Sequence, residues 1–200
     1  MFSKEIDTFV PINALLSERW SGVAYDPERQ VSADDIRRLA EAARWAPSCF
    51  GDQPWRYIIV NRFKNPEAWQ KGFDCLAEGN KAWVQHAPLL ILACHDTCFS
   101  HNGMPNNWGS YDTGAASMSL CIQATALGLM THQMAGFMPD KARTNFAIPE
   151  RYTPLAMITV GYQLPADKIP EQFRPRETSP RKRNPLAAHF FENSWGDGLL

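Results

Sequence analysis

The chain has little of what marks membrane, nucleic-acid-binding or secreted proteins. Its 20 Lys and Arg residues nearly balance 21 Asp and Glu residues, and the net charge of −1 gives no reason to expect nucleic acid or a membrane surface as partner. No apolar run approaches the roughly 20 residues that span a bilayer. The opening MFSKEIDTFVP lacks the basic and apolar regions of a signal peptide. We therefore expect a cytoplasmic protein.

Cysteine is sparse and shows no pairing pattern. The five cysteines include no C-x-x-C pair, so we expect reduced thiols rather than a disulfide framework. Cys94, His95, Cys98 and His101 lie close in sequence and leave a zinc-binding module as an alternative. Their spacing fits no recognised zinc pattern, however, and His95 would point to the opposite face of a strand from Cys94. We therefore expect no metal site.

What is present is a globular composition. With 200 residues, 44% apolar and 20% charged, the chain suits one domain over 1–200, in which residues 165–200 form a C-terminal arm. Apolar runs and turn signals predict extended segments at 57–60, 89–94, 129–137 and 155–161. Start and stop signals predict helices after Pro11 and Ser32, from Pro66, and over 76–86, 111–127 and 140–146.

Two of the predicted segments carry apolar side chains that need a further surface to pack against. Residues 111–127 carry small or apolar side chains on nearly every side, which predicts a helix buried all round. The proline-rich arm still carries Phe190, Phe191 and Trp195, apolar anchors that a disordered tail rarely holds. We expect the arm to wrap a surface, either its own or a partner subunit's.

The most informative stretch is APSCFGDQPWRYIIV, residues 46–60. Pro47 ends the preceding helix because it lacks an N–H, and an apolar strand follows the loop. Ser48, Cys49 and Gly51 have little side-chain bulk, which would let a flat ligand approach the backbone N–H groups closely. Taken alone, the loop is an ordinary helix–strand connection.

Basic side chains near both ends of the chain suit an anion. Arg19 with Ser21 offers a bidentate cation and a hydroxyl, a combination suited to a phosphate oxygen. Arg181 and Arg183 alternate with Lys182, so in an extended segment both guanidinium groups would face the same way. Each of these groups alone is most simply a solvated surface charge.

Together these segments resemble the FMN-dependent nitroreductase family. The resemblance covers about Leu16 to Gly196 and rests on six blocks in the family's order: ERWSGVAYD, AARWAPSCFGDQPWRYIIV, GNKAWVQHAPLLILAC, DTGAASMSLCIQATALGL, HQMAGF with the later ITVGY, and PRKRNPL. It implies an α+β fold with a nitroreductase-like antiparallel sheet flanked by helices. It also implies an intertwined homodimer with FMN at the interface and the C-terminal extension on the partner subunit.

The resemblance also implies which positions bind the cofactor. The arginines near the two ends fall where the family holds the FMN phosphate, and the 47–51 loop falls beside the ring and ribityl chain, supplied by the partner subunit. The amide of Asn80 falls at the pyrimidine edge, and residues 133–136 fall against the flavin, with a backbone N–H near N5. The implied positions are Arg19, Trp20, Ser21, Pro47, Ser48, Cys49, Gly51, Asn80, Gln133, Met134, Ala135, Gly136, Arg181 and Arg183.

Departures from the family pattern concern charge near the ring. Val23 and Trp83 stand where family members place cations near flavin N1 and O2, Gly51 replaces a frequent asparagine, and Ala135 replaces a glutamate of one branch. A nearby cation stabilises the negative charge of reduced flavin, so we expect a lower flavin potential here than in members that keep those cations. Lys81 is the remaining candidate cation.

The implied activity is that of an NAD(P)H-dependent FMN oxidoreductase that reduces nitroaromatic, quinone or similar small conjugated acceptors in two half-reactions. The flavin carries the chemistry, so no side chain is expected as a general acid–base catalyst. The Trp69–Trp83 region and the 96–108 loop are expected to shape the acceptor pocket. Alternatives are a specialised reaction of the same fold, such as enone reduction or dehalogenation, and flavin binding without useful turnover. No G-x-G-x-x-G motif is present to distinguish NADH from NADPH.

Overall fold

The computed structural model describes residues 4, 6 and 8–199 and contains an antiparallel sheet. Its strands pair in the order β1-β2-β4-β3, every neighbouring pair antiparallel. The strands are β1 (Trp55–Asn61), β2 (Leu89–Asp96), β3 (Met130–Met134) and β4 (Tyr152–Gly161). The predicted α+β class, an antiparallel sheet flanked by helices, is confirmed.

The helices begin where the sequence provides capping groups. The Ser32 side chain accepts a hydrogen bond from the Asp35 N–H at 3.0 Å, and the Asn65 side chain caps the next helix, which has Pro66 in its first turn. The α-helices are α1 (Ala14–Glu18), α2 (Ala33–Arg44), α3 (Pro66–Phe73), α4 (Glu78–Val84), α5 (Gly109–Ala126), α6 (Pro139–Asn145) and α7 (Arg174–Thr178). Short 3-10 turns are η1 (Cys49–Gly51), η2 (Ala166–Lys168) and η3 (Leu186–Ala188).

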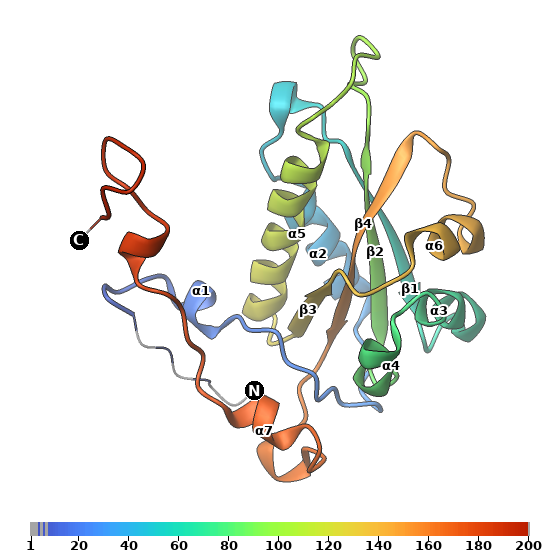
Figure 1. Cartoon of the computed structure of the whole chain (residues 1–200). Coiled ribbons are helices and arrows are strands. Elements are labelled where there is room, and N and C mark those ends of the chain that lie inside the picture. Colours follow the sequence, from blue (N-terminus) through green and yellow to red (C-terminus); the bar gives the residue numbers. More distant parts are fainter. Residues whose placement is uncertain (1–3, 5, 7, 200) are drawn as a thin grey trace.

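The sheet separates two apolar clusters, because alternate residues of a strand face opposite sides. Leu89 and Ile91 of β2 pack with α2 and α5 on one face. Leu90 and Leu92 pack with α3, α4 and α6 on the other. Figure 1 shows α2 and α5 on one side of the strands and α3, α4 and α6 on the other.

Element boundaries differ from the predictions where pairing or capping outweighs hydrophobicity. Strands β1 and β4 begin earlier than expected because ladder pairing continues to Trp55, opposite His95, and to Tyr152, opposite Asp96. The first helix starts at Ala14 rather than near Pro11, since the Asn13 side chain accepts the Leu15 N–H. Beyond residue 165, where no helix was predicted, α7 forms a single short helix.

The prediction that the long helix is buried all round is wrong for the single chain. Buried residues of α5 recur every three or four positions and pack on the sheet and α2. The opposite side of α5 is open, with Tyr111 72% exposed, Met118 37% exposed and Gly114 also exposed. Apolar composition on every side therefore leaves an uncovered apolar face in one copy of the chain.

Residues 184–199, the end of the predicted C-terminal arm and called the arm from here on, are organised by their own local contacts. The Leu199 N–H donates to the Phe190 carbonyl at 2.8 Å, and the Phe191 and Trp195 rings lie 4.9 Å apart. Among the described residues, the hydrogen bonds of 184–199 all stay within the arm. Figure 1 shows residues 184–199 running away from the sheet, past α1. The earlier part of the predicted arm does pack on its own subunit, because Ile169 and Glu177 are buried and Arg181 bonds the Arg19 carbonyl. The predicted wrapping therefore takes place on the chain's own surface over residues 165–183 and not over 184–199.

Candidate active site

The loop between α2 and β1 is shaped by an internal hydrogen-bond network. The Ser48 hydroxyl accepts the Gln53 N–H at 3.0 Å, and the Ser48 carbonyl accepts the Gly51 N–H at 2.9 Å. The Cys49 N–H donates to the Asp112 carboxylate at 3.0 Å. The loop does have the small side chains expected of it, but the Cys49 and Gly51 N–H groups already have protein partners. A ligand beside this loop would therefore contact other groups, such as the exposed surface of Pro47.

The same loop places three residues in the left-handed region of backbone conformation. The φ angles are 55° for Phe50, 65° for Gly51 and 51° for Gln53. Gly51 adopts this conformation freely, whereas the two side-chain-bearing residues each cost about 1 kcal/mol there. The hydrogen bonds from Asp112 and Ser48 maintain the turn against this cost.

Three arginines meet near the two ends of the chain. The Arg181 guanidinium donates to the Arg19 carbonyl at 2.9 Å and also to the carbonyls of Ser17 and Lys4, while its Nε is buried without a hydrogen-bond partner among the described residues. Burial lowers the pKa of Arg181, and the charges of Arg19 and Arg183 lower it further. Within the described chain, no carboxylate forms an ion pair with any of the three.

Arg181 and Arg183 make different contacts in this structure. Arg181 turns its donors onto backbone carbonyls and so fixes the segment that carries Arg19, while Arg183 is exposed and bonds the carbonyl of Lys182 at 2.8 Å. Uncompensated positive charge at one place favours an anion.

A third set of predicted cofactor residues, Asn80 with Gln133 to Gly136, lies where β3 ends, close to α4. The Asn80 side-chain NH₂ donates to the Gly136 carbonyl at 2.9 Å, and the Ala77 N–H donates to the same oxygen at 3.0 Å. A Cβ at position 136 would come within 2.6 Å of the Asn80 Nδ2, so a larger residue there would push the Asn80 amide out of this contact. Asn80 thus holds the backbone after Gln133–Ala135, leaving its amide oxygen for another contact.

Two of the predicted cofactor positions are buried, so they can contact a ligand only through their backbone. Trp20 and Met134 are each 5% exposed and lie in the core, with Lys4 4.4 Å above the Trp20 ring. Ser21 and Ala135, between such core residues and the surface, are exposed. The chain therefore alternates side chains that anchor the site with positions open to a ligand.

The predicted positions fall into two regions along α5. The Gln133 amide lies 3.5 Å from the Cys121 sulfur, and the Arg19 charge is close enough to lower the pKa of that thiol, which burial raises. The loop after α2 instead meets α5 at Asp112. Asp112 and Cys121 are nine positions apart in the helix, which is about 14 Å along its axis. One chain thus places its basic residues and its 47–51 loop toward different ends of α5.

The family-model and structural comparisons identify the family of the chain. Residues 16–162 match the family model described as the nitroreductase family. The chain belongs to the nitroreductase family. A solved oxidoreductase containing FMN is similar over 98% of both chains, with a TM-score of 0.88 and 31% identity. A nitroreductase family protein from Clostridium difficile 630 has a TM-score of 0.69 and 26% identity over 90% of this chain and 96% of that one.

Curated relatives of this nitroreductase-family chain are similarly distant. A proposed NADH dehydrogenase/NAD(P)H nitroreductase of Methanothermobacter thermautotrophicus is 31% identical over 68% of this chain and 69% of that protein. An uncharacterized 15.4 kDa protein of Mycolicibacterium smegmatis is 31% identical over 62% of this chain and 82% of that protein.

Core side chains occupy the two positions at which the family resemblance implies cations near the flavin. Val23 and Trp83 are 1% and 2% exposed, and the Trp83 ring stacks on His132 at 4.5 Å. Burial lowers the pKa of His132 against the opposing effect of its hydrogen bond to the Gly22 carbonyl, and the charges of Arg176 and Arg19 lower it further. Lys81, the remaining candidate, pairs with Glu78 at 2.6 Å.

The alternative of a zinc module gains no support from the geometry. Cys94 is buried in the sheet, His95 contacts the Asp96 carbonyl, and His101 lies 3.7 Å from Asp52. Among the described residues, no three His, Cys, Asp or Glu side chains gather as metal ligands. Within that same part of the chain, no helix is long and apolar enough to span a membrane.

Sequence reasoning missed Asp112 and Asp52, which shape the loop after α2. Both act on residues far from them in sequence, Asp112 on Cys49 and Asp52 on Ser100. An acidic residue in the first turn of a helix is an ordinary helix-dipole feature, so Asp112 gave no separate signal. Spatial proximity of two loops is a tertiary property that one sequence does not display.

Proposed function

We propose that this chain is an NAD(P)H-dependent FMN oxidoreductase that reduces small conjugated acceptors such as nitroaromatics and quinones. The observation that carries the proposal is the group of arginines formed by Arg19, Arg181 and Arg183. Among the described residues none of the three has a carboxylate partner and the Arg181 Nε is buried without a hydrogen bond, which fits the phosphate of a mononucleotide. The solved relative that contains FMN supports the same cofactor.

The remaining predicted contacts fit the other end of such a ligand. Ala135 and Gly136, at the end of β3, are exposed, and Asn80 holds the Gly136 carbonyl, so this segment is open to a ligand ring. The free amide oxygen of Asn80 can accept a hydrogen bond from a ring N–H of the ligand. FMN, when bound, supplies the chemistry: it takes a hydride from NAD(P)H and passes it to the acceptor.

The protein residues would bind and orient rather than exchange protons. Arg181 fixes the Arg19 segment, Arg183 adds charge, and Asn80 orients the backbone that faces the ring. No side chain of the described site is proposed as a general acid or base. The buried Val23 and Trp83 leave the ring without the cations that other members use, so a low flavin potential remains our prediction.

A complete site would require two copies of the chain. The basic residues and the 47–51 loop lie toward different ends of α5, so the loop that completes one site would come from the partner of a homodimer. The open apolar face of α5 and the arm that bonds only within itself are the surfaces such a partner would cover. All five cysteines are free thiols, which suits the proposed cytoplasmic location.

A visible absorption spectrum of the purified protein is the first test. We expect flavin bands that bleach on anaerobic addition of NADH or NADPH and return when a quinone or nitroaromatic is added. Bound FMN that neither nucleotide reduces would contradict the oxidoreductase and favour flavin binding without turnover. A colourless protein that takes up no added FMN would contradict the cofactor itself.

The Arg183→Ala variant connects that spectrum to the arginine group. Arg183 makes no contact that holds the fold beyond its neighbour's carbonyl, so the variant should fold normally and bind FMN about tenfold more weakly. Lys168→Ala, an exposed cation outside the proposed site, is the matched control. Equal FMN affinity in all three proteins would remove the phosphate assignment.

A further inference from the structure

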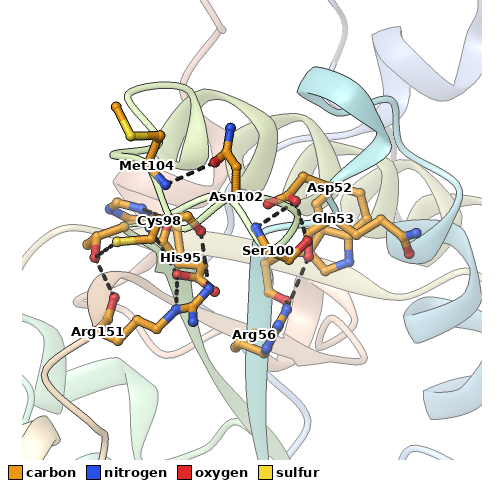
Figure 2. Close-up of polar contacts among 12 residues, drawn as sticks. Asp52, Gln53, Arg56, His95, Cys98, Ser100, Asn102, Met104 and Arg151 are labelled. Atoms are coloured by element: carbon orange, nitrogen blue, oxygen red, sulfur yellow. Dashed lines mark hydrogen bonds and ion pairs between the residues drawn. The ribbon is translucent and has the colours of Figure 1, made fainter.

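Asp52 connects two loops that are far apart in sequence. Its carboxylate accepts hydrogen bonds from the Ser100 N–H at 2.9 Å and from the Ser100 hydroxyl, and the His101 Nδ1 lies 3.7 Å away. The Asp52 side chain is 3% exposed. Burial alone would raise the pKa of Asp52, but the hydrogen bonds from Ser100, together with the nearby His101, outweigh it and lower the pKa. Figure 2 shows Asp52 and Ser100 facing each other across the gap between the loops.

Aromatic packing extends the same junction. The Phe50 ring meets Phe99 edge-on at 5.7 Å and His101 at 5.3 Å, and Phe99 and His101 lie 5.4 Å apart. Phe50 is 79% exposed, so these contacts form a surface cluster rather than part of the core. Residues 50 and 52 of one loop are therefore both fixed by residues 99–101 of the other.

The 96–107 loop, which hydrogen-bonds the Asp52 carboxylate, is itself held in place by contacts at its start. Arg151 pairs with the Asp96 carboxylate at 2.7 Å, which also accepts the Cys98 N–H at 3.0 Å. The Thr97 N–H donates to the Arg151 carbonyl at 3.1 Å. These contacts tie the start of the 96–107 loop to β2 and to the turn before β4, as Figure 2 shows for Arg151 and Cys98.

The loop that carries Asp52, by contrast, needs external support. Phe50, Gly51 and Gln53 have positive φ, a conformation that persists when surrounding contacts over-determine it. The Cys49 N–H donates to Asp112, and Arg56 donates to the Gln53 carbonyl at 3.0 Å. These two contacts anchor the two ends of the strained segment. Between these two anchors, among the described residues, the carboxylate of Asp52 provides the hydrogen bonds to another loop.

We propose that Asp52 is a positioning residue. By accepting hydrogen bonds from the 96–107 loop, its carboxylate holds the 47–51 turn in the conformation that would face the cofactor. The proposal rests on the proposed function for the identity of the ligand, but the coupling between the two loops is a property of the protein alone. Asp52 touches neither cofactor nor acceptor in this role. Its effect passes through Ser48–Gly51, which the partner's flavin would meet.

Hydrogen–deuterium exchange of the whole protein tests the coupling without any cofactor. In Asp52→Ala, peptides covering 46–54 and 97–104 should both exchange about tenfold faster or more, the factor expected for loss of charge-assisted hydrogen bonds. In Asp52→Asn both should stay close to the parent, because the amide oxygen can accept the same two bonds from Ser100. Asp26→Asn is the matched control, since Asp26 likewise accepts a backbone N–H, from Glu28, at 3.0 Å.

A second substitution, in the other loop, distinguishes loss of the contact between the loops from general unfolding of the protein. Ser100→Ala removes one donor from the 96–107 loop and should speed exchange in 46–54, across the junction. Faster exchange confined to the substituted loop in both Asp52→Ala and Ser100→Ala would overturn the coupling. Asp52→Asn as fast as Asp52→Ala would overturn the hydrogen-bonding role of the carboxylate.

FMN titration then tests the positioning role. The dissociation constant for FMN should rise about tenfold or more in Asp52→Ala, while Asp26→Asn stays at the parent value. At saturating FMN, kcat with ferricyanide, an acceptor that needs no shaped pocket, should be unchanged. Coupled exchange with unchanged FMN affinity would overturn the positioning role, whereas failure of every protein to bind FMN would overturn the proposed function and leave the exchange result to decide the coupling.

Discussion

Two exposed aromatic regions of this chain, the loop after α2 and the C-terminal arm, are built in opposite ways. Phe50 in the loop is 79% exposed, yet its segment is held by side chains from α5, β1 and the 96–107 loop. Trp195 in the arm is 92% exposed and packs on Phe191, four residues away. The loop owes its shape to its own subunit, whereas the arm has a local shape that lacks a surface to rest on.

Exposed apolar side chains therefore have two different settings in this chain. In the loop they accompany strained backbone and long-range hydrogen bonds, the features of a preorganised segment. In the arm they accompany local contacts alone, which leaves apolar surface uncovered on the single chain.

Removal of the arm should have the largest effect. Without residues 185–200, the proposed dimer should weaken at least about a hundredfold, since aromatic anchors at interfaces commonly contribute roughly 2 kcal/mol or more each. Sedimentation velocity over a concentration series measures this, with Trp195→Ala as the milder form. Met138→Ala, an exposed apolar residue on the other face of the sheet, is the control. A shortened protein that dimerises as tightly as the parent would show that the arm is not an interface element.

Arg181 and Arg183 should differ in what they stabilise. Arg181→Ala leaves the carbonyls of Lys4, Ser17 and Arg19 without their donor and should lower the free energy of unfolding by about 2 kcal/mol. Arg183→Ala should change it by less than about 0.5 kcal/mol. Urea unfolding without FMN makes the comparison. Equal losses in the two variants would contradict the structural role of Arg181.

Gly51 and Gly79 should respond oppositely to alanine, although both have open space around them. Gly51 has φ of 65°, so Gly51→Ala should cost about 1 kcal/mol of unfolding free energy. Gly79 lies within α4, so Gly79→Ala should add up to about 1 kcal/mol. Thermal unfolding of both variants against the parent decides. A neutral Gly51→Ala would mean that the turn relaxes and is not held as described.

Acid should loosen the 96–107 loop, with the smallest effect of the series. Burial would raise the pKa of Asp96, but hydrogen bonds from Arg151 and the Cys98 N–H outweigh it and lower the pKa below the ordinary value. A lowered folded-state pKa contributes stability above the unfolded value and loses it as the pH falls through the folded value, here below about pH 4. Arg151→Met should therefore flatten the decline of unfolding free energy between pH 5 and acid, as followed by urea titrations. Parallel declines in parent and variant would remove Arg151 as the cause.

Local rules determined the elements of this protein from its sequence. The Ser32 and Asn65 caps, Pro66 and the apolar runs place α2, α3, β2 and β4 within a few residues of their predicted positions, because these signals act over one or two turns. Ordered motifs from Arg19 to Arg183 likewise led from sequence to the nitroreductase family, which the family model confirms.

Tertiary structure alone decided how the site is built. No local rule shows that Asp112 occupies the Cys49 N–H, that Arg181 serves backbone carbonyls, or that Val23 and Trp83 are core residues. Each of these outcomes joins groups that are distant in sequence, and such pairings depend on the packing of every element between them. The sequence therefore determined the helices, the strands and the family of this protein, while packing decided which of its polar groups remain free to meet a ligand.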